Sequence, residues 1–118
     1  MRVKSRADID LDRAIVRGLL RRRPTADFQS QPLGTLDGFA VLHLAAQADR
    51  ILISHDVSTM PGAFAEYRQA APSPGVLLVL WPLAETIENL VLIRELSAAE
   101  EWRDRICYLP TLSDLRIP

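Results

Sequence analysis

The stretch Arg50-Ile51-Leu52-Ile53-Ser54-His55-Asp56 decides the fold of this chain. Its apolar residues follow one another without alternation, two of them are β-branched, and the run stops at a polar pair. A short continuous apolar run of this kind is typical of a strand buried on both faces, as in parallel sheets. A second run of the same character is Val76-Leu77-Leu78-Val79-Leu80. Together the two runs predict the centre of a mostly parallel sheet.

Segments with helical periodicity separate the predicted strands. Strands are expected at residues 2–7, 26–29, 50–54, 76–80 and 106–109, and helices at 11–23, 38–48, 60–70 and 83–96, with a short helix opened by a capping box at 97–100. Alternation of strands and helices predicts βαβ units, with helices on both faces of the sheet. The sequence therefore predicts one three-layer α/β domain over residues 1–118, with a sheet of four to five strands and a loosely held tail at 111–118.

Length and composition limit the alternatives. The chain has 118 residues, of which 48% are hydrophobic and 25% charged, as in a single globular domain. Its one cysteine, Cys107, excludes a disulfide framework and a zinc site built from cysteines. The longest apolar run is far shorter than a membrane span. We therefore expect a cytoplasmic protein with no membrane partner.

Aspartates gather where a parallel α/β sheet forms its active site, at the carboxyl ends of the strands. Asp8 and Asp10 follow the first predicted strand, Asp56 follows the third, and Asp37 opens the helix before it. Such carboxylates repel one another unless a cation lies between them, and oxygen ligands suit Mg²⁺ or Mn²⁺. The alternative is that Asp10, Asp12 and Asp37 only cap helices, as Ser58 or Thr59 is expected to do for the helix at 60–70.

Several segments resemble one known family, the short bacterial and archaeal PIN-like domains. The segments are Ala7-Asp8-Ile9-Asp10, Ile15 to Leu20, Leu36-Asp37 with Val41-Leu42, the run from Arg50 to Asp56, and Ser58-Thr59-Met60-Pro61. The resemblance covers residues 2–110, and the Ser-His-Asp motif after a strand is its most specific part. It implies a PIN-type fold, similar to that of the toxin ribonucleases of toxin–antitoxin systems.

The resemblance also implies a chemistry. In such proteins clustered acids hold Mg²⁺ or Mn²⁺, which activates water to cut RNA, and an antitoxin protein can be the partner. Carried over by position, Asp8, Asp37 and Asp56 are the catalytic and metal-binding acids and Asp10 is an accessory one. The chain departs from the pattern at Ile9, where many relatives have glutamate, and at Gly38, where many have proline. Ile9 and the net acidic second half of the chain favour an alternative, a catalytically degenerate module that acts through a protein partner.

A ribonuclease needs a basic track for its substrate. Arg13, Arg17 and Arg21 recur every four residues on the first predicted helix, which indicates a stripe for RNA phosphates. The alternative is a solvated face that pairs with nearby acids. His55 is a further accessory candidate, because imidazole can carry a proton near neutral pH; the alternative is that it only shapes its loop.

Two expectations concern apolar residues. Trp81 and Trp102 are expected to be packing residues, although Trp81, which follows a strand at the site edge, is also placed to stack on a base. The helix at 83–96 carries four apolar residues in a row, more than one core-facing stripe needs. This surplus predicts a homodimer through Ile87, Leu90 and Leu92, unless the following helix, which carries Trp102, covers it.

A phosphoacceptor receiver domain is the nearest rival from another functional class. Paired acids after the first strand and an aspartate after the third would fit it. A receiver also needs a hydroxyl residue after the next strand and a lysine after the last one. Here Trp81-Pro82 and Leu109-Pro110 occupy those places, and the only lysine is Lys4. The receiver reading is therefore rejected.

Overall fold

Five parallel strands form the single sheet of the computed structural model, which describes residues 1–32, 34 and 36–110. The predicted tail at 111–118 lies outside the described residues. The strands are β1 (Lys4–Ala7), β2 (Asp27–Gln29), β3 (Ile51–Ser54), β4 (Val76–Val79) and β5 (Ile106–Leu109). They pair in the order β2-β1-β3-β4-β5, with β1 and β3 in register at Arg6 and Leu52. The predicted α/β class and the parallel sheet are confirmed.

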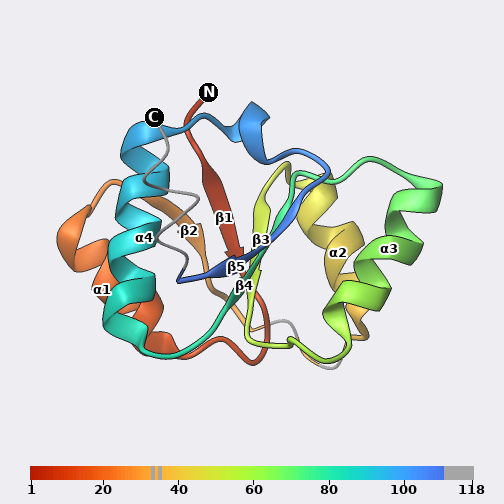
Figure 1. The fold of residues 1–118 in the computed structure, drawn as a ribbon, viewed down its shortest axis with the longest axis horizontal. Helices are drawn as coiled ribbons and strands as arrows, with labels where there is room; N and C mark the ends of the chain where they lie inside the picture. The colour runs from red at the N-terminus through yellow and green to blue at the C-terminus, as the bar shows by residue number, and fades with distance from the viewer. Residues whose placement is uncertain (33, 35, 111–118) are drawn as a thin grey trace.

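Helices cover both faces of the sheet, which gives the predicted three layers (Figure 1). The helices are α1 (Arg13–Arg22), α2 (Gly38–Gln47), α3 (Met60–Ala70) and α4 (Leu83–Leu96), followed by the short 3₁₀ helix η1 (Ala99–Trp102). Helix α1 packs on α4 at one face, and α2 packs on α3 at the other. Every predicted element is present, with ends that differ by at most two residues.

The two central strands bury all of their side chains, as their continuous apolar runs predict. Residues of β3 and β4 alternate between the two faces, because successive side chains of a strand point in opposite directions. Ile53 and Val79 join the core beneath α1 and α4, whereas Leu52 and Leu78 join the core beneath α2 and α3. The strands therefore hold the carboxyl edge of the sheet between two packed layers.

Two of the three helix caps expected from the sequence form with a side-chain hydrogen bond. The side chain of Asp12 accepts a hydrogen bond from the Ala14 amide at the start of α1, and that of Asp37 accepts one from Ala40 at the start of α2. At α3, Thr59 occupies the expected N-cap position, but no side-chain hydrogen bond caps the helix. Neither hydroxyl caps the helix; both donate to the carboxylate of Asp56, which also accepts the Thr59 amide.

The predicted capping box at 97–100 begins one residue too early. The carboxylate of Glu101 accepts the Ala98 amide at 2.6 Å, so the 3₁₀ helix starts after Ala98. The hydroxyl of Ser97 is engaged elsewhere: it donates to the Ile93 carbonyl and accepts the indole N–H of Trp102 at 2.8 Å. Bonds to Ile93 and Trp102 thus occupy the hydroxyl that was expected to cap the helix.

Helix α4 buries most of the apolar surface on which the homodimer prediction rests. Leu90 is buried in the core and cannot lie in an interface, and Ile87 packs against Gly18 of α1. Trp102 belongs to the same core, as the alternative required. Of the three interface candidates only Leu92 is exposed, at 36%. The homodimer stays a prediction, with a smaller surface to support it.

None of the helices in the part of the chain that the structure describes is long and apolar enough to span a membrane.

Candidate functional site at the carboxyl ends of β1 and β3

The strand order creates a switch point between β1 and β3. The chain leaves β1 toward β2 on one side and leaves β3 toward β4 on the other. In open α/β sheets ligands bind in the crevice that this divergence leaves at the carboxyl ends of the strands. Asp8 and Asp10 follow β1 here, and His55 and Asp56 follow β3. Four of the predicted site residues thus lie at the switch point.

Ser54, the last residue of β3, links three of these carboxylate residues. It is fully buried, and its hydroxyl donates to Oδ2 of Asp8 at 2.7 Å. The hydroxyl oxygen of Ser54 also accepts the Asp56 amide at 3.0 Å and lies 3.5 Å from Oδ1 of Asp10. Ser54 belongs to the Ser-His-Asp motif, but no role was expected for it. The available signal was a hydroxyl residue ending an otherwise apolar, buried strand.

Asp8 is a buried carboxylate, only 8% exposed. Its Oδ1 accepts the Ile9 amide at 2.7 Å and its Oδ2 accepts the Ser54 hydroxyl. Burial raises the pKa of Asp8 above its usual value, and the negative charges of Asp10 and Asp56 raise it further, although the two hydrogen bonds oppose the shift. The ionised form of Asp8 is therefore destabilised relative to the protonated form, and a bound cation would stabilise it.

Asp56 lies in the opposite electrostatic situation. The hydroxyl and amide of Thr59 donate to its carboxylate, and the Ser58 hydroxyl donates at 3.2 Å. The hydrogen bonds from Thr59, aided by those from Ser58, lower the pKa of Asp56, while burial opposes the shift only partly. Asp56 therefore has a structural task, fixing the turn into α3, beside any role at the site.

Asp10 and His55 complete the group at the switch point. Asp10 is exposed, and its Oδ1 accepts the His55 amide at 3.3 Å. The His55 ring lies 2.9 Å, through Nδ1, from the carbonyl of Val79 at the end of β4, so Nδ1 carries the proton and donates. Nε2 is buried without a partner among the described residues. The contact with Val79 supports the reading in which His55 shapes its loop.

Asp37 stands apart from the other acids. It is exposed, caps α2 and has no hydrogen bond to Asp8, Asp10 or Asp56. Over residues 1–32, 34 and 36–110, no group of three or more His, Cys, Asp or Glu side chains is arranged to hold a metal ion. Asp8, Asp10 and Asp56 share contacts with Ser54, but neither they nor the predicted set of Asp8, Asp37 and Asp56 form a ready group of metal ligands among the described residues, and metal binding stays a prediction.

The arginines of α1 divide into two groups. Arg22 pairs with Glu88 and Arg23 with Glu95, which joins α1 to α4 across the surface. Arg13 lies at the site end of the helix, with Nη1 3.5 Å from the Ser30 carbonyl. Arg17 and Arg21 are exposed and make no ion pair within the part of the chain that the structure covers. We call Arg13, Arg17 and Arg21 the α1 stripe, and its last two guanidinium groups are free to bind an anionic partner.

Arg6 is a buried cation that sequence reasoning missed. It lies two residues before Asp8 on the same face of β1, and its guanidinium donates to the side chain and carbonyl of Gln31. Burial and the charge of Arg50 lower the pKa of Arg6, and the charge of Asp8 opposes them. A single charged residue in a short strand gives no sequence signal that its side chain is buried.

The residues at the ends of β4 and β5 do not fit a phosphoacceptor receiver domain. Thr86, the nearest hydroxyl after β4, is buried and donates to the Leu80 carbonyl at 3.1 Å. Leu109 is buried at the end of β5, where a receiver would need its lysine, and Lys4 starts β1 at the opposite edge of the sheet.

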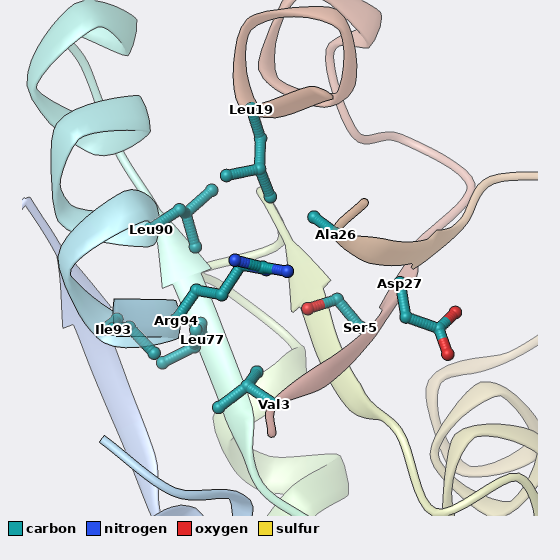
Figure 2. Close-up of a pocket in the computed structure, with 9 residues that line it drawn as sticks. All are labelled: Val3, Ser5, Leu19, Ala26, Asp27, Leu77, Leu90, Ile93 and Arg94. Atoms are coloured by element: carbon teal, nitrogen blue, oxygen red, sulfur yellow. The ribbon is translucent and has the colours of Figure 1, made fainter. Parts of the chain in front are cut away.

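A pocket away from the acids is too small for a substrate. It lies between α1, α4 and the sheet, and Figure 2 shows its lining by Val3, Ser5, Leu19, Ala26, Asp27, Leu77, Leu90, Ile93 and Arg94. Its free volume of about 10 Å³ is room for about one water molecule. The candidate site at the switch point thus rests on its carboxylates and their contacts, not on this pocket.

Comparison with protein-family models, with curated proteins and with solved structures finds no match in any of the three.

Proposed function

We propose that the chain is a Mg²⁺- or Mn²⁺-dependent ribonuclease of PIN type, acting in the cytoplasm, with an antitoxin protein as a possible partner. The observation that carries the proposal is the meeting of Asp8, Asp10 and Asp56 around Ser54 at the switch point, where burial, and then the charges of the other two acids, raise the pKa of Asp8. A buried carboxylate whose pKa is raised, with further carboxylates beside it, is typical of functional sites rather than of solvated surface.

The donor set suits a hard divalent cation. Mg²⁺ binds through one or two carboxylates and keeps several waters, so Asp8 and Asp56 would be enough without a preformed group of three ligands. Each carboxylate has about four lone-pair positions, so the hydrogen bonds accepted by Asp8 and Asp56 leave lone pairs free to bind a cation. A divalent ion bound there would supply a water of lowered pKa and neutralise charge on the scissile phosphate.

The chain's own residues have distinct tasks in this proposal. Asp8 and Asp56 bind the ion, and Ser54 orients Asp8 through its 2.7 Å hydrogen bond. Asp10, which is exposed beside them, would accept a hydrogen bond from the attacking water and so orient it. The α1 stripe binds RNA phosphates and starts at the site end of α1, where Arg13 lies. Asp37 keeps only its capping task.

A degenerate binding module is the second candidate. Ile9 favours it, because this residue is 59% exposed beside Asp8, at the position where the family's pattern has glutamate. An exposed apolar residue at the mouth of the site suits a protein partner better than it suits a metal site. The two functions differ in one measurable property, metal-dependent cleavage of single-stranded RNA.

Thermal unfolding with and without Mn²⁺, and Mn²⁺-dependent RNA cleavage, test the proposal. In Asp8→Asn and Asp56→Asn we expect both the Mn²⁺ stabilisation and the cleavage to disappear. Asp49→Asn is the control: it makes the same chemical change at a distant aspartate with φ of 55°, a conformation that asparagine tolerates. Equal Mn²⁺ shifts in all four proteins would refute the ion site, and a site that binds Mn²⁺ without cleavage would favour the degenerate module.

A further inference from the structure

The ring of Trp81 lies open at the edge of the candidate site. Trp81 follows β4 and is 70% exposed, so the expectation that it packs in the core is wrong. Trp102, in contrast, is buried and its indole N–H is bonded to Ser97, as a packing residue should be. An indole left in water forgoes the burial that usually dominates aromatic energetics, so its exposure suggests an unmet contact.

One neighbour fixes the orientation of this ring. The His55 and Trp81 rings are stacked, with centroids 6.2 Å apart and planes only 10° from parallel. His55 is itself fixed, because its ring donates to the Val79 carbonyl and its amide donates to Asp10. Trp81 is therefore connected to the carboxylate group through a chain of direct contacts, Asp10 to His55 to Trp81.

We propose that Trp81, stacked on His55, is a platform for a nucleobase of single-stranded RNA, placed beside the carboxylates of the candidate site. This inference rests on the proposed function for the identity of the ligand. Base–aromatic stacking needs an exposed ring of fixed orientation, and it accepts any base because every base has a π-face. A base would extend the parallel pair that His55 and Trp81 already form.

A nucleic acid fits this edge better than an apolar protein surface does. Apolar residues follow three strands here, Ile9, Val57 and Leu80, and all are exposed. A protein face packed on them would also cover the exposed carboxylate of Asp10, whose burial without a partner is costly. A nucleotide places a planar base on the ring while its phosphate and sugar leave the acids accessible to water and cations.

The platform can be tested without cleavage and without metal. The probe is a short single-stranded 2′-O-methyl RNA in EDTA, and the readout is quenching of tryptophan fluorescence by the full chain. The chain has two tryptophans, and Trp102 is buried, so quenching reports on Trp81. Affinity is measured in parallel from the anisotropy of a labelled oligonucleotide, which also serves variants without Trp81.

We expect saturable quenching, and an affinity about tenfold weaker in Trp81→Ala, the loss of one base stack. Trp81→Phe, which keeps a π-face, restores most of the affinity. Leu96→Ala is the matched control, because Leu96 is 72% exposed at the far end of α4, and its affinity stays unchanged. An oligomer of abasic sugar phosphates binds the original chain as weakly as the base-containing oligomer binds Trp81→Ala. Unchanged emission from Trp102 verifies that each variant is folded.

Equal affinity for the base-containing and abasic oligomers, or for the original chain and Trp81→Ala, overturns the platform. Self-association that Trp81→Ala abolishes, with no quenching by RNA, also overturns it and assigns the ring to a protein contact. Failure of the proposed function gives a different pattern: quenching without Mn²⁺-dependent cleavage leaves the platform in place. Cleavage with unchanged binding in Trp81→Ala rejects the platform and leaves the nuclease.

Discussion

Replacing Ser54 by alanine tests how the site is held together. The hydroxyl of Ser54 is fully buried and donates to the carboxylate of Asp8 at 2.7 Å, and a hydrogen bond to a charged group contributes about 1.5–3 kcal/mol. The substitution also removes the acceptor of the Asp56 amide, at a cost of about 1 kcal/mol. We expect Ser54→Ala to lower the free energy of unfolding at pH 7 by about 2–4 kcal/mol, and Tm by about 8–16 °C.

The cost should depend on pH in a fixed direction. The Ser54 hydrogen bond lowers the folded-state pKa of Asp8, against burial that raises it above the unfolded value. Removing the bond raises the folded-state pKa further, so the variant's deficit is complete where Asp8 is ionised in both states. The deficit shrinks as pH falls through the folded-state pKa, because a protonated Asp8 no longer needs the bond.

Urea unfolding of both proteins at pH 7 and at pH values near 4 measures the effect. Ser97→Ala is the control, since the Ser97 hydroxyl bonds only to the neutral Ile93 carbonyl and Trp102 indole, and its cost should not change with pH. If the Ser54→Ala deficit is as large at low pH as at pH 7, the bond does not stabilise an ionised Asp8 and the reasoning fails. A deficit below about 1 kcal/mol at pH 7 would refute it as well.

Two further predictions concern binding and backbone geometry. Reversing Arg17 and Arg21 to glutamate should weaken binding of single-stranded RNA and lower the slope of log affinity against log salt by about 1.4, for two lost phosphate contacts; an unchanged slope returns the stripe to solvated surface. Gly75→Ala should cost at least about 2 kcal/mol, because φ at Gly75 is +120° and a Cβ there would lie 2.4 Å from the Trp102 carbonyl oxygen. Gly62→Ala, in α3 with nothing within 4 Å of its Cβ, should instead stabilise by about 0.5–1 kcal/mol in the same urea assay, and equal effects at both glycines would contradict this account.

The fold was predictable because burial leaves a strong pattern in short strands. The runs in β3 and β4 are continuous since both faces of each strand are covered, one by α1 and α4 and the other by α2 and α3. The same pattern misled the expectation for α4. Three of its four consecutive apolar residues, Leu90, Val91 and Ile93, are buried in the core within one chain, whereas Leu92 is exposed.

The hydrogen bonds of the site were less predictable, because they join residues far apart in the chain. Ser54 and Asp8 are 46 positions apart, and their contact depends on the parallel register of β1 and β3. Local pattern also cannot separate an aspartate that caps a helix from one that faces a site. Asp37 and Asp56 both precede a helix, yet only Asp56 lies close enough to Asp8 to raise its pKa.

The two strand-end carboxylates differ in what surrounds them, and this difference determines how the site would respond to acid. Asp56 accepts hydrogen bonds from Thr59 and Ser58, which lower its pKa and keep it anionic. Burial, and then the like charges of Asp10 and Asp56, raise the pKa of Asp8, so it is the first of the pair to take up a proton as pH falls. A cation bound by both carboxylates would therefore be released as Asp8 protonates, while Asp56 continues to fix the start of α3. Because the hydrogen bonds from Ser54 and from the Ile9 amide oppose the rise in the pKa of Asp8, they extend toward acid the pH range in which the pair could hold a divalent ion.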